Sequence, residues 1–322
     1  MGKIMITARL LASTVVATLL LTTTSGCSIK RMAVNKVGDA LAGGGTTFTG
    51  DEDPELVRAA LPFSLKLMES LLAESPRHRG LLEASASGFM GYSYLFVQQD
   101  ADEMEEKDFT ASVQLRNRGR QLCLRARDYG LRGLDVNHPG FAKSLRLHPR
   151  ETLRAATVRD VPLLYWTTVS WAAAIGQAKN NPALIAELPV IDALVEQVLQ
   201  LDEKYDSGAM HSFLITYEMT RPGPPETLIT RSREHFDRAL QLCDAQQAGP
   251  YLSLAEAVSL PGQNRAEFES LLKKALAINP AARPEWRLVN VVMQRRARWL
   301  LDHIDDLFPP TPASESPKPE NS

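Results

Sequence analysis

The sequence has 322 residues, of which 44% are hydrophobic and 23% charged, and its formal net charge is −2. Such a composition is that of an ordinary globular protein, with enough apolar side chains for one extended core or two modest ones. It excludes the strongly basic surface that nucleic-acid binding requires, so we predict no nucleic-acid partner. Leu and Ala dominate the apolar residues and aromatics make up only 7%, which favours helices over strands.

Residues 1–26 have the features of a bacterial lipoprotein signal peptide. Positive residues come first, and an uncharged apolar run of 12 residues follows from Leu10 to Leu21. A membrane span takes about 20 residues, so this run matches the hydrophobic region of a signal peptide instead. The small residues Ser25 and Gly26 directly precede Cys27, in an order similar to that of a lipobox. We therefore predict that Cys27 carries a lipid anchor to a membrane, the alternative being an ordinary signal peptide with a chance Cys.

Two low-complexity segments flank the rest of the chain. Residues 27–52 contain Gly43-Gly44-Gly45 and show no apolar period, which predicts a flexible tether. Residues 309–322 contain five prolines and no large apolar side chain, which predicts a disordered tail. The intervening residues 53–308 are expected to form the folded domain.

The first helical segment runs from about Asp53 to Ser75. Apolar residues recur there at helical spacing: Leu61, Leu65, Met68 and Leu72. A return helix from Leu81 to Gln98 carries a stripe of mostly small residues: Ala84, Gly88, Gly91 and Leu95. Close packing against a neighbouring backbone would compensate for the helix propensity that glycine costs. The two segments predict an antiparallel helical hairpin.

Similar helix endings recur along the chain, each an apolar tail followed by a polar or proline stop. Leu199, Leu240 and Leu276 mark three of them, 41 and 36 residues apart, which brackets the 34-residue tetratricopeptide period. A second amphipathic segment follows each tail: Ala209 to Met219, Tyr251 to Leu260, and Trp286 to Phe308. We therefore predict an all-α fold, a tetratricopeptide-like stack of antiparallel helical hairpins that forms one continuous α-solenoid without β-sheet. Stacked hairpins curve and offer a concave surface.

No motif for chemistry is recognisable. The glycine run lacks the Lys and Ser/Thr of a phosphate loop, and the six histidines never form a His-Glu-x-x-His arrangement. A Gly-x-Ser-x-Gly elbow is also missing. We therefore predict no catalytic residue, no metal site, no cofactor and no enzymatic activity. A hydrolase hidden in a helical fold is a further hypothesis, since nothing in a sequence selects one carboxylate pair among 38 acids.

Two other features have competing interpretations. An acidic block from Asp100 to Glu106 precedes a helix with five arginines between Arg116 and Arg127. We interpret both as solvated surfaces that pair with each other, with partner docking as the alternative. Cys123 and Cys243 lie inside helical patterns, which favours buried thiols over a disulfide.

Aromatic residues cluster on two of the predicted helices. Most aromatics at helical spacing belong to a core. Some of these carry a polar group as well, and stacking of the hairpins can bring them to a common channel wall. The candidates for such a ligand or partner groove, together with one histidine, are Tyr92, Tyr94, Tyr165, Trp166, Trp171 and His211.

Several stretches resemble a known family. They are Pro62-Phe63-Ser64-Leu65-Lys66 and Tyr92-x-Tyr94-x-Phe96-Val97 in the first hairpin, and Ser207-Gly208-Ala209-Met210-His211 and Glu234-His235-Phe236-Asp237-Arg238-Ala239-Leu240 further on. They are similar to the T component associated with tripartite ATP-independent periplasmic (TRAP) transporters, the TatT family. The resemblance covers about residues 50–300 and fits less well at Thr220 to Thr230, which is rich in proline.

The resemblance implies a function that the residue patterns do not show. A T component is a non-enzymatic, periplasm-facing lipoprotein that associates with a solute-binding P component and hands on a ligand, plausibly hydrophobic, toward a permease. The expected partners are thus the solute-binding protein, a hydrophobic small molecule and a membrane, and a homo-oligomer stays open. Ser28 replaces the Asp that marks inner-membrane retention, so we expect the outer membrane. A generic tetratricopeptide lipoprotein scaffold for envelope assembly is the alternative.

Overall fold

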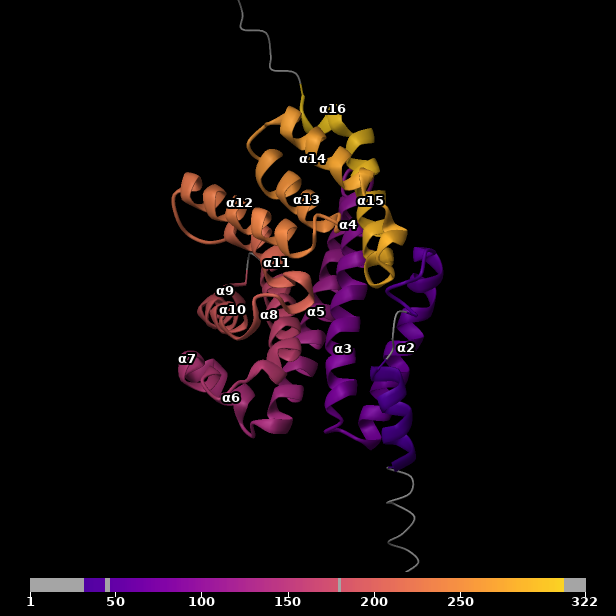
Figure 1. Ribbon diagram of the computed structural model, residues 1–322, viewed down its shortest axis with the longest axis vertical. Coiled ribbons are helices and arrows are strands. Elements are labelled where there is room, and N and C mark those ends of the chain that lie inside the picture. The colour runs from indigo at the N-terminus through magenta and orange to yellow at the C-terminus, as the bar shows by residue number, and fades with distance from the viewer. Residues whose placement is uncertain (1–31, 44–46, 179–180, 310–322) are drawn as a thin grey trace, which may run out of the picture. The chain divides into compact units, whose positions relative to one another are not determined.

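The computed structural model describes residues 32–43, 47–178 and 181–309 (Figure 1). The predicted signal peptide, Cys27 and residues 310–322 of the tail lie outside the described residues. Every regular element within the described ranges is a helix and no strand occurs there, which confirms the all-α class. The described residues divide into two compact units: unit 1 comprises residues 32–43, 58–178 and 181–194, and unit 2 comprises residues 47–57 and 195–309. A tetratricopeptide-like arrangement remains a prediction.

Unit 1 contains most of the long helices and one π-helical segment, η1. Its elements in chain order are α2 (Pro54–Glu74), α3 (Arg79–Tyr92), η1 (Ser93–Gln98), α4 (Gln99–Met104), α5 (Phe109–Asn137), α6 (Phe141–Leu147), α7 (Pro149–Leu153), η2 (Val158–Asp160), α8 (Val161–Gly176), α9 (Pro182–Ile185) and the first half of α10 (Leu188–Asp202). The first turn of α2 and the second half of α10 belong to unit 2.

Unit 2 contains the remaining helices and a second π-helical segment, η4. Its elements are η3 (Tyr205–Ser207), α11 (Ala209–Glu218), α12 (Pro225–Leu242), α13 (Gly249–Leu254), η4 (Ala255–Ser259), α14 (Arg265–Ala277), η5 (Pro280–Ala282), η6 (Pro284–Trp286), α15 (Arg287–Asp302) and α16 (Ile304–Leu307). The predicted helix endings are confirmed, because α10, α12 and α14 end within three residues of their marker leucines.

The first predicted hairpin is present as α2 and α3. Met68 and Leu72 of α2 form a buried cluster with Leu81 and Leu82 of α3, and burying each such leucine side chain contributes about 2 kcal/mol. Gly88 lies so close to α2 that an added Cβ would be 2.7 Å from Leu65 Cδ2. The glycine therefore serves the close approach that the small-residue stripe predicted.

Helix α5 packs against both α3 and α8. Phe89 of α3 and Tyr129 of α5 stack with ring centroids 5.8 Å apart. Gly130 of α5 lies against Thr167 of α8, where an added Cβ would be 2.2 Å from the Thr167 hydroxyl oxygen. The start of α3 meets the start of α8 through an ion pair of 3.1 Å from Arg79 to Asp160. Helices α3 and α8 therefore run in the same direction, and α5 runs opposite to both.

The expectation of a flexible tether over residues 27–52 needs a correction. Residues 32–42 form a helix that packs on unit 1. Leu41 contacts the cluster of Met68 and Leu81, and the Ser75 hydroxyl donates to Asn35 Oδ1 at 2.7 Å. Several contacts of this helix are polar: besides Leu41, Asn35 and Asp39 bind Ser75 and His78, at 2.7 and 3.3 Å. Polar contacts leave no apolar period in a sequence, so the helix was not predicted.

Buried polar side chains close the loops of unit 2. Asn290 of α15 donates to the Gln246 carbonyl and accepts from the Ala248 amide at 2.8 Å. Gln294, one turn later, donates to the Ala275 and Ile278 carbonyls at the end of α14. These amides satisfy backbone groups that a helix end leaves unpaired. They hold α15 against the loops before α13 and after α14.

Candidate functional site

Each unit contains one π-helical segment, η1 in unit 1 and η4 in unit 2. Such segments are rare and occur frequently at functional sites, because the extra residue re-aims the side chains around it. In unit 1, η1 continues α3 directly and carries Tyr94, a predicted groove residue. The surface of α3 and η1 is therefore a candidate binding site.

One face of α3 and η1 is half-buried. It consists of Glu83, Ser87, Gly91 and Tyr94, spaced three or four residues apart. No atom would lie within 4 Å of a Cβ added at Gly91, so this part of the face has open space beside it. Burial raises the pKa of the Glu83 carboxyl, while nearby Arg79 acts in the opposite direction. A carboxyl group shifted by desolvation is a common feature of binding and catalytic sites.

Helix α8 contributes the second part of the candidate site. It is almost entirely buried and apolar, yet Tyr165 and Trp166 remain half-buried. Their rings meet edge to face with centroids 4.9 Å apart. Helix α3 packs on α8, and each has one fully buried serine, Ser85 and Ser170, whose hydroxyl has no hydrogen-bond partner among the described residues.

Two of the predicted groove aromatics are buried instead. Tyr92 is 9% exposed, and the Arg118 guanidinium lies 5.5 Å from its ring centroid. Trp171 has no exposed surface, and its indole nitrogen donates to Glu187 Oε2 at 2.7 Å. Arg127 and Arg146 each lie 5.1 Å from the Trp171 ring centroid. Such cation–π contacts stabilise a fold, and they leave the Trp171 ring no free face.

His211, the last predicted groove residue, belongs to unit 2. It is buried on α11, with its Nδ1 2.9 Å from Nδ1 of His235 on α12. Sequence reasoning selected His211 as a groove residue but not His235. The sequence does contain a signal for the pair, because His211 and His235 each lie in one of the stretches that resemble the family, Ser207–His211 and Glu234–Leu240. Which unit holds a given residue could not be predicted from spacing.

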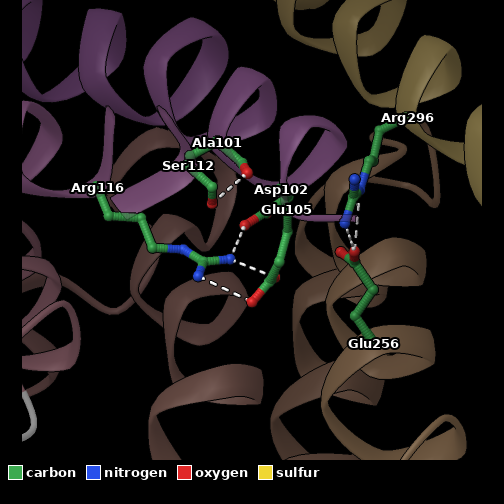
Figure 2. Close-up of polar contacts among 7 residues, drawn as sticks. All are labelled: Ala101, Asp102, Glu105, Ser112, Arg116, Glu256 and Arg296. Atoms are coloured by element: carbon green, nitrogen blue, oxygen red, sulfur yellow. Dashed lines mark hydrogen bonds and ion pairs between the residues drawn. The ribbon is translucent and has the colours of Figure 1, made fainter. Parts of the chain in front are cut away.

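One arginine of α5, Arg116, pairs with the acidic block as expected (Figure 2), whereas Arg125 and Arg127 bind carboxylates outside that block. The guanidinium of Arg116 binds Glu105 through both nitrogens, at 2.5 and 3.0 Å, and reaches Asp102 at 3.3 Å. The Ser112 hydroxyl donates to the Ala101 carbonyl at 2.7 Å, which fixes the start of α5 on α4. These charges therefore have a structural role in unit 1.

Unit 2 has a comparable ion pair at its own π-helical segment. Arg296 of α15 is 8% exposed and donates to Glu256 of η4 at 2.8 and 3.1 Å (Figure 2). The guanidinium also lies 4.7 Å from the ring centroid of Trp299. A nearly buried arginine of this kind needs its carboxylate partner, because an unpaired buried charge is costly.

The two thiols are buried, and the ionisable side chains of the described residues do not converge on a metal site. Cys123 and Cys243 are buried free thiols, as predicted, and burial raises the pKa of Cys123 to about 11. Across the described ranges no group of three or more His, Cys, Asp or Glu side chains is arranged to hold a metal ion. No helix in the part of the chain that the structure describes has both the length and the apolarity for a membrane span.

Comparison with known proteins decides the family. The model of the TAtT family, TRAP transporter T-component, matches residues 50–308. The chain belongs to this family. A Treponema pallidum (strain Nichols) protein described as uncharacterized is 30% identical over 304 residues, which is 88% of this chain and 94% of that protein. The resemblance found in the sequence is confirmed, and the match covers the described helices from α2 onward.

Membership has direct consequences for the T component described here. The family is an accessory component of TRAP transport and is not known as enzymatic, which supports an accessory role in solute uptake and a location in the cell envelope. Which side chains contact a partner or a ligand is a separate question, for which the half-buried face of α3, η1 and α8 is the candidate.

Proposed function

We propose that this T component binds the solute-binding protein of a TRAP transporter and passes it a hydrophobic ligand. It does so as a lipid-anchored protein on the periplasmic side of the envelope, held through Cys27 in the outer membrane. The family match over residues 50–308 carries the proposal. A tetratricopeptide-like stack of hairpins is part of it, since such stacks present concave binding surfaces.

The half-buried face of unit 1 suits a hydrophobic ligand. Tyr94 of η1 and the pair Tyr165 and Trp166 of α8 supply half-buried aromatic surface with polar tips, and Gly91 leaves room beside α3. Sites for small molecules are mostly apolar with a few polar groups that fix orientation. Glu83 and Ser87 of α3 are polar groups on the same face.

The test is a pull-down of the full-length lipoprotein from the cell envelope, with identification of the proteins and small molecules that co-purify. We expect a solute-binding protein and a hydrophobic compound. Recovery of envelope-assembly proteins without either would favour the scaffold alternative. A Trp166→Ala variant, with Trp286→Phe as a matched change in unit 2, tests the face itself: only the former should lose the small molecule.

The anchor is tested separately, because the proposal places it on Cys27. Replacing Cys27 by Ala should release the protein from the membrane fraction into the soluble fraction. The positive residues and the apolar run before Cys27 stay intact in this variant, so export should continue. A Cys27→Ala protein that still sediments with membranes would show that the lipobox interpretation is wrong.

A further inference from the structure

Four ionisable side chains of unit 2 lie in a row across the hairpin of α11 and α12. Glu203 Oε2 is 3.5 Å from His211 Nε2, and the Nδ1 atoms of His211 and His235 are 2.9 Å apart. At the other end, His235 Nε2 is 3.9 Å from Glu218 Oε1. Glu203 follows α10, His211 and Glu218 belong to α11, and His235 belongs to α12. The row thus joins three consecutive helices.

The row has one proton fewer than its geometry requires. The row contains three gaps: Glu203 to His211, His211 to His235, and His235 to Glu218. Each gap needs one N–H group for a hydrogen bond. Two neutral imidazoles supply one N–H each. When one of them donates across the central gap, only one N–H remains for the two carboxylates. Whichever tautomers form, a bare nitrogen then faces a carboxylate.

The unsatisfied atoms of the structure agree with this count. His211 Nε2 and Glu218 Oε2 are both buried and have no hydrogen-bond partner among the described residues. His211 Nε2 is the ring nitrogen that faces Glu203, at one end of the row. At the other end, Glu218 Oε1 faces His235 and already pairs with Arg221 at 2.8 Å, so the atom without a hydrogen bond is the second oxygen of that carboxylate. Buried polar atoms are normally paired, so two such atoms in one network call for an explanation.

We propose that His211 and His235 bind a single shared proton, which completes a hydrogen-bond chain from Glu203 to Glu218. The proton comes from solvent and adds to a ring nitrogen, and no other bond forms or breaks. With it bound, one Nδ1–H spans the central gap and both Nε2–H groups point at carboxylates. The end gaps of 3.5 and 3.9 Å then close toward hydrogen-bond length, which draws the end of α10 and α12 onto α11. The site makes this hairpin responsive to acid.

The surrounding charges determine the pH at which the proton binds. Arg238 pairs with Glu203, and Arg221 and Arg231 lie 2.8 and 3.8 Å from Glu218. Helix α13, which packs on the same hairpin, contributes Tyr251 against Phe236. Three guanidinium groups thus face two carboxylates, which opposes added positive charge.

Burial acts in the same direction as these arginines. It lowers the pKa of His211, where Glu203 works in the opposite sense. Burial, His211 and the two arginines lower the pKa of His235 to about 4. The proton therefore enters only below the pKa of an ordinary histidine, and a second proton is opposed by the first. This inference does not depend on the proposed function.

The experiment follows the two imidazole rings by NMR titration of the full chain between pH 7 and 4. We expect both rings to respond over the same interval, below the midpoint of an ordinary histidine, with one proton bound in total. In His211→Gln the proton can no longer be shared, so His235 should titrate alone, with a midpoint that differs from that of the pair. His235→Gln is the reciprocal measurement on His211 and serves if the first variant does not fold.

The control is His303→Gln, also in unit 2. The His303 ring stacks on Trp299 and bonds to the Trp299 carbonyl, away from the pair of α11 and α12. Its replacement should leave both curves unchanged. Two rings with separate midpoints, each unaffected when the other is replaced, would overturn the proposal, as would two protons bound within this range.

Discussion

The contact between α5 and α8 predicts a substitution whose effect reverses the usual rule for glycine in a helix. Alanine favours a helix by up to about 1 kcal/mol over glycine. At Gly130, however, the added Cβ would be 2.2 Å from Thr167 Oγ1, 3.2 Å from Thr167 Cβ and 3.4 Å from Thr167 Cα. The hydroxyl cannot move freely, because it is buried and donates to the Leu163 carbonyl at 2.6 Å. Overpacking of this kind costs about 1–3 kcal/mol.

We therefore expect Gly130→Ala to lower the free energy of unfolding of unit 1 by about 1–2 kcal/mol after the gain in helix propensity. Gly91→Ala is the matched control, because no atom lies within 4 Å of its added Cβ, and it should raise stability by about 0.5–1 kcal/mol. Urea denaturation followed by circular dichroism measures both. Thr167→Ala in the Gly130→Ala background removes the closest contact and should recover part of the loss. Equal, stabilising effects of the two glycine substitutions would refute the close approach of α5 to α8.

Three further predictions concern side chains of both units. Trp171→Ala should lower the free energy of unfolding by about 3–5 kcal/mol in a thermal melt, since the ring is fully buried. Trp166→Ala should cost less stability and weaken ligand or partner binding. An equal loss of stability with unchanged binding would make Trp166 a core residue. Asp160→Asn should lower the free energy of unfolding by about 3 kcal/mol, because this buried carboxylate binds Arg79, His138 and the Thr157 amide. A loss below about 0.5 kcal/mol, which is typical of surface substitutions, would contradict this prediction. The pKa of His235, about 4, lies below that of an unfolded histidine, so the unfolded chain binds more protons. The free energy of unfolding should therefore fall as pH drops from about 6.5 to 4, by up to about 3 kcal/mol. In His235→Gln it should depend less on pH, and an unchanged pH dependence would exclude His235 as its source.

Much of the fold could be predicted from local patterns. The α2–α3 hairpin follows from the apolar spacing of its two segments, and the ends of α10, α12 and α14 follow from their leucine tails. The division into two units could not be predicted, because it depends on which helices pack together and α10 contributes to both. Asp160 was missed for a similar reason: its partners Arg79 and His138 are 81 and 22 residues away. Contacts over such distances leave no periodic signal.

The candidate site shows where the helical period itself misleads. The stripe of Ala84, Gly88, Gly91 and Leu95 was predicted as one packing face, on the assumption of 3.6 residues per turn throughout. Gly88 does pack on α2, whereas Gly91 has open space beside it. Two residues later the backbone widens into η1, which adds a residue to the turn and rotates the subsequent side chains relative to those of α3. Leu95 therefore leaves the register of the stripe. Tyr94 is half-buried, whereas Tyr92 is 9% exposed and covered by Arg118, and a helical period does not encode this difference in burial between two tyrosines so close in sequence. The half-buried Tyr94 is therefore a better candidate for binding than the buried Tyr92.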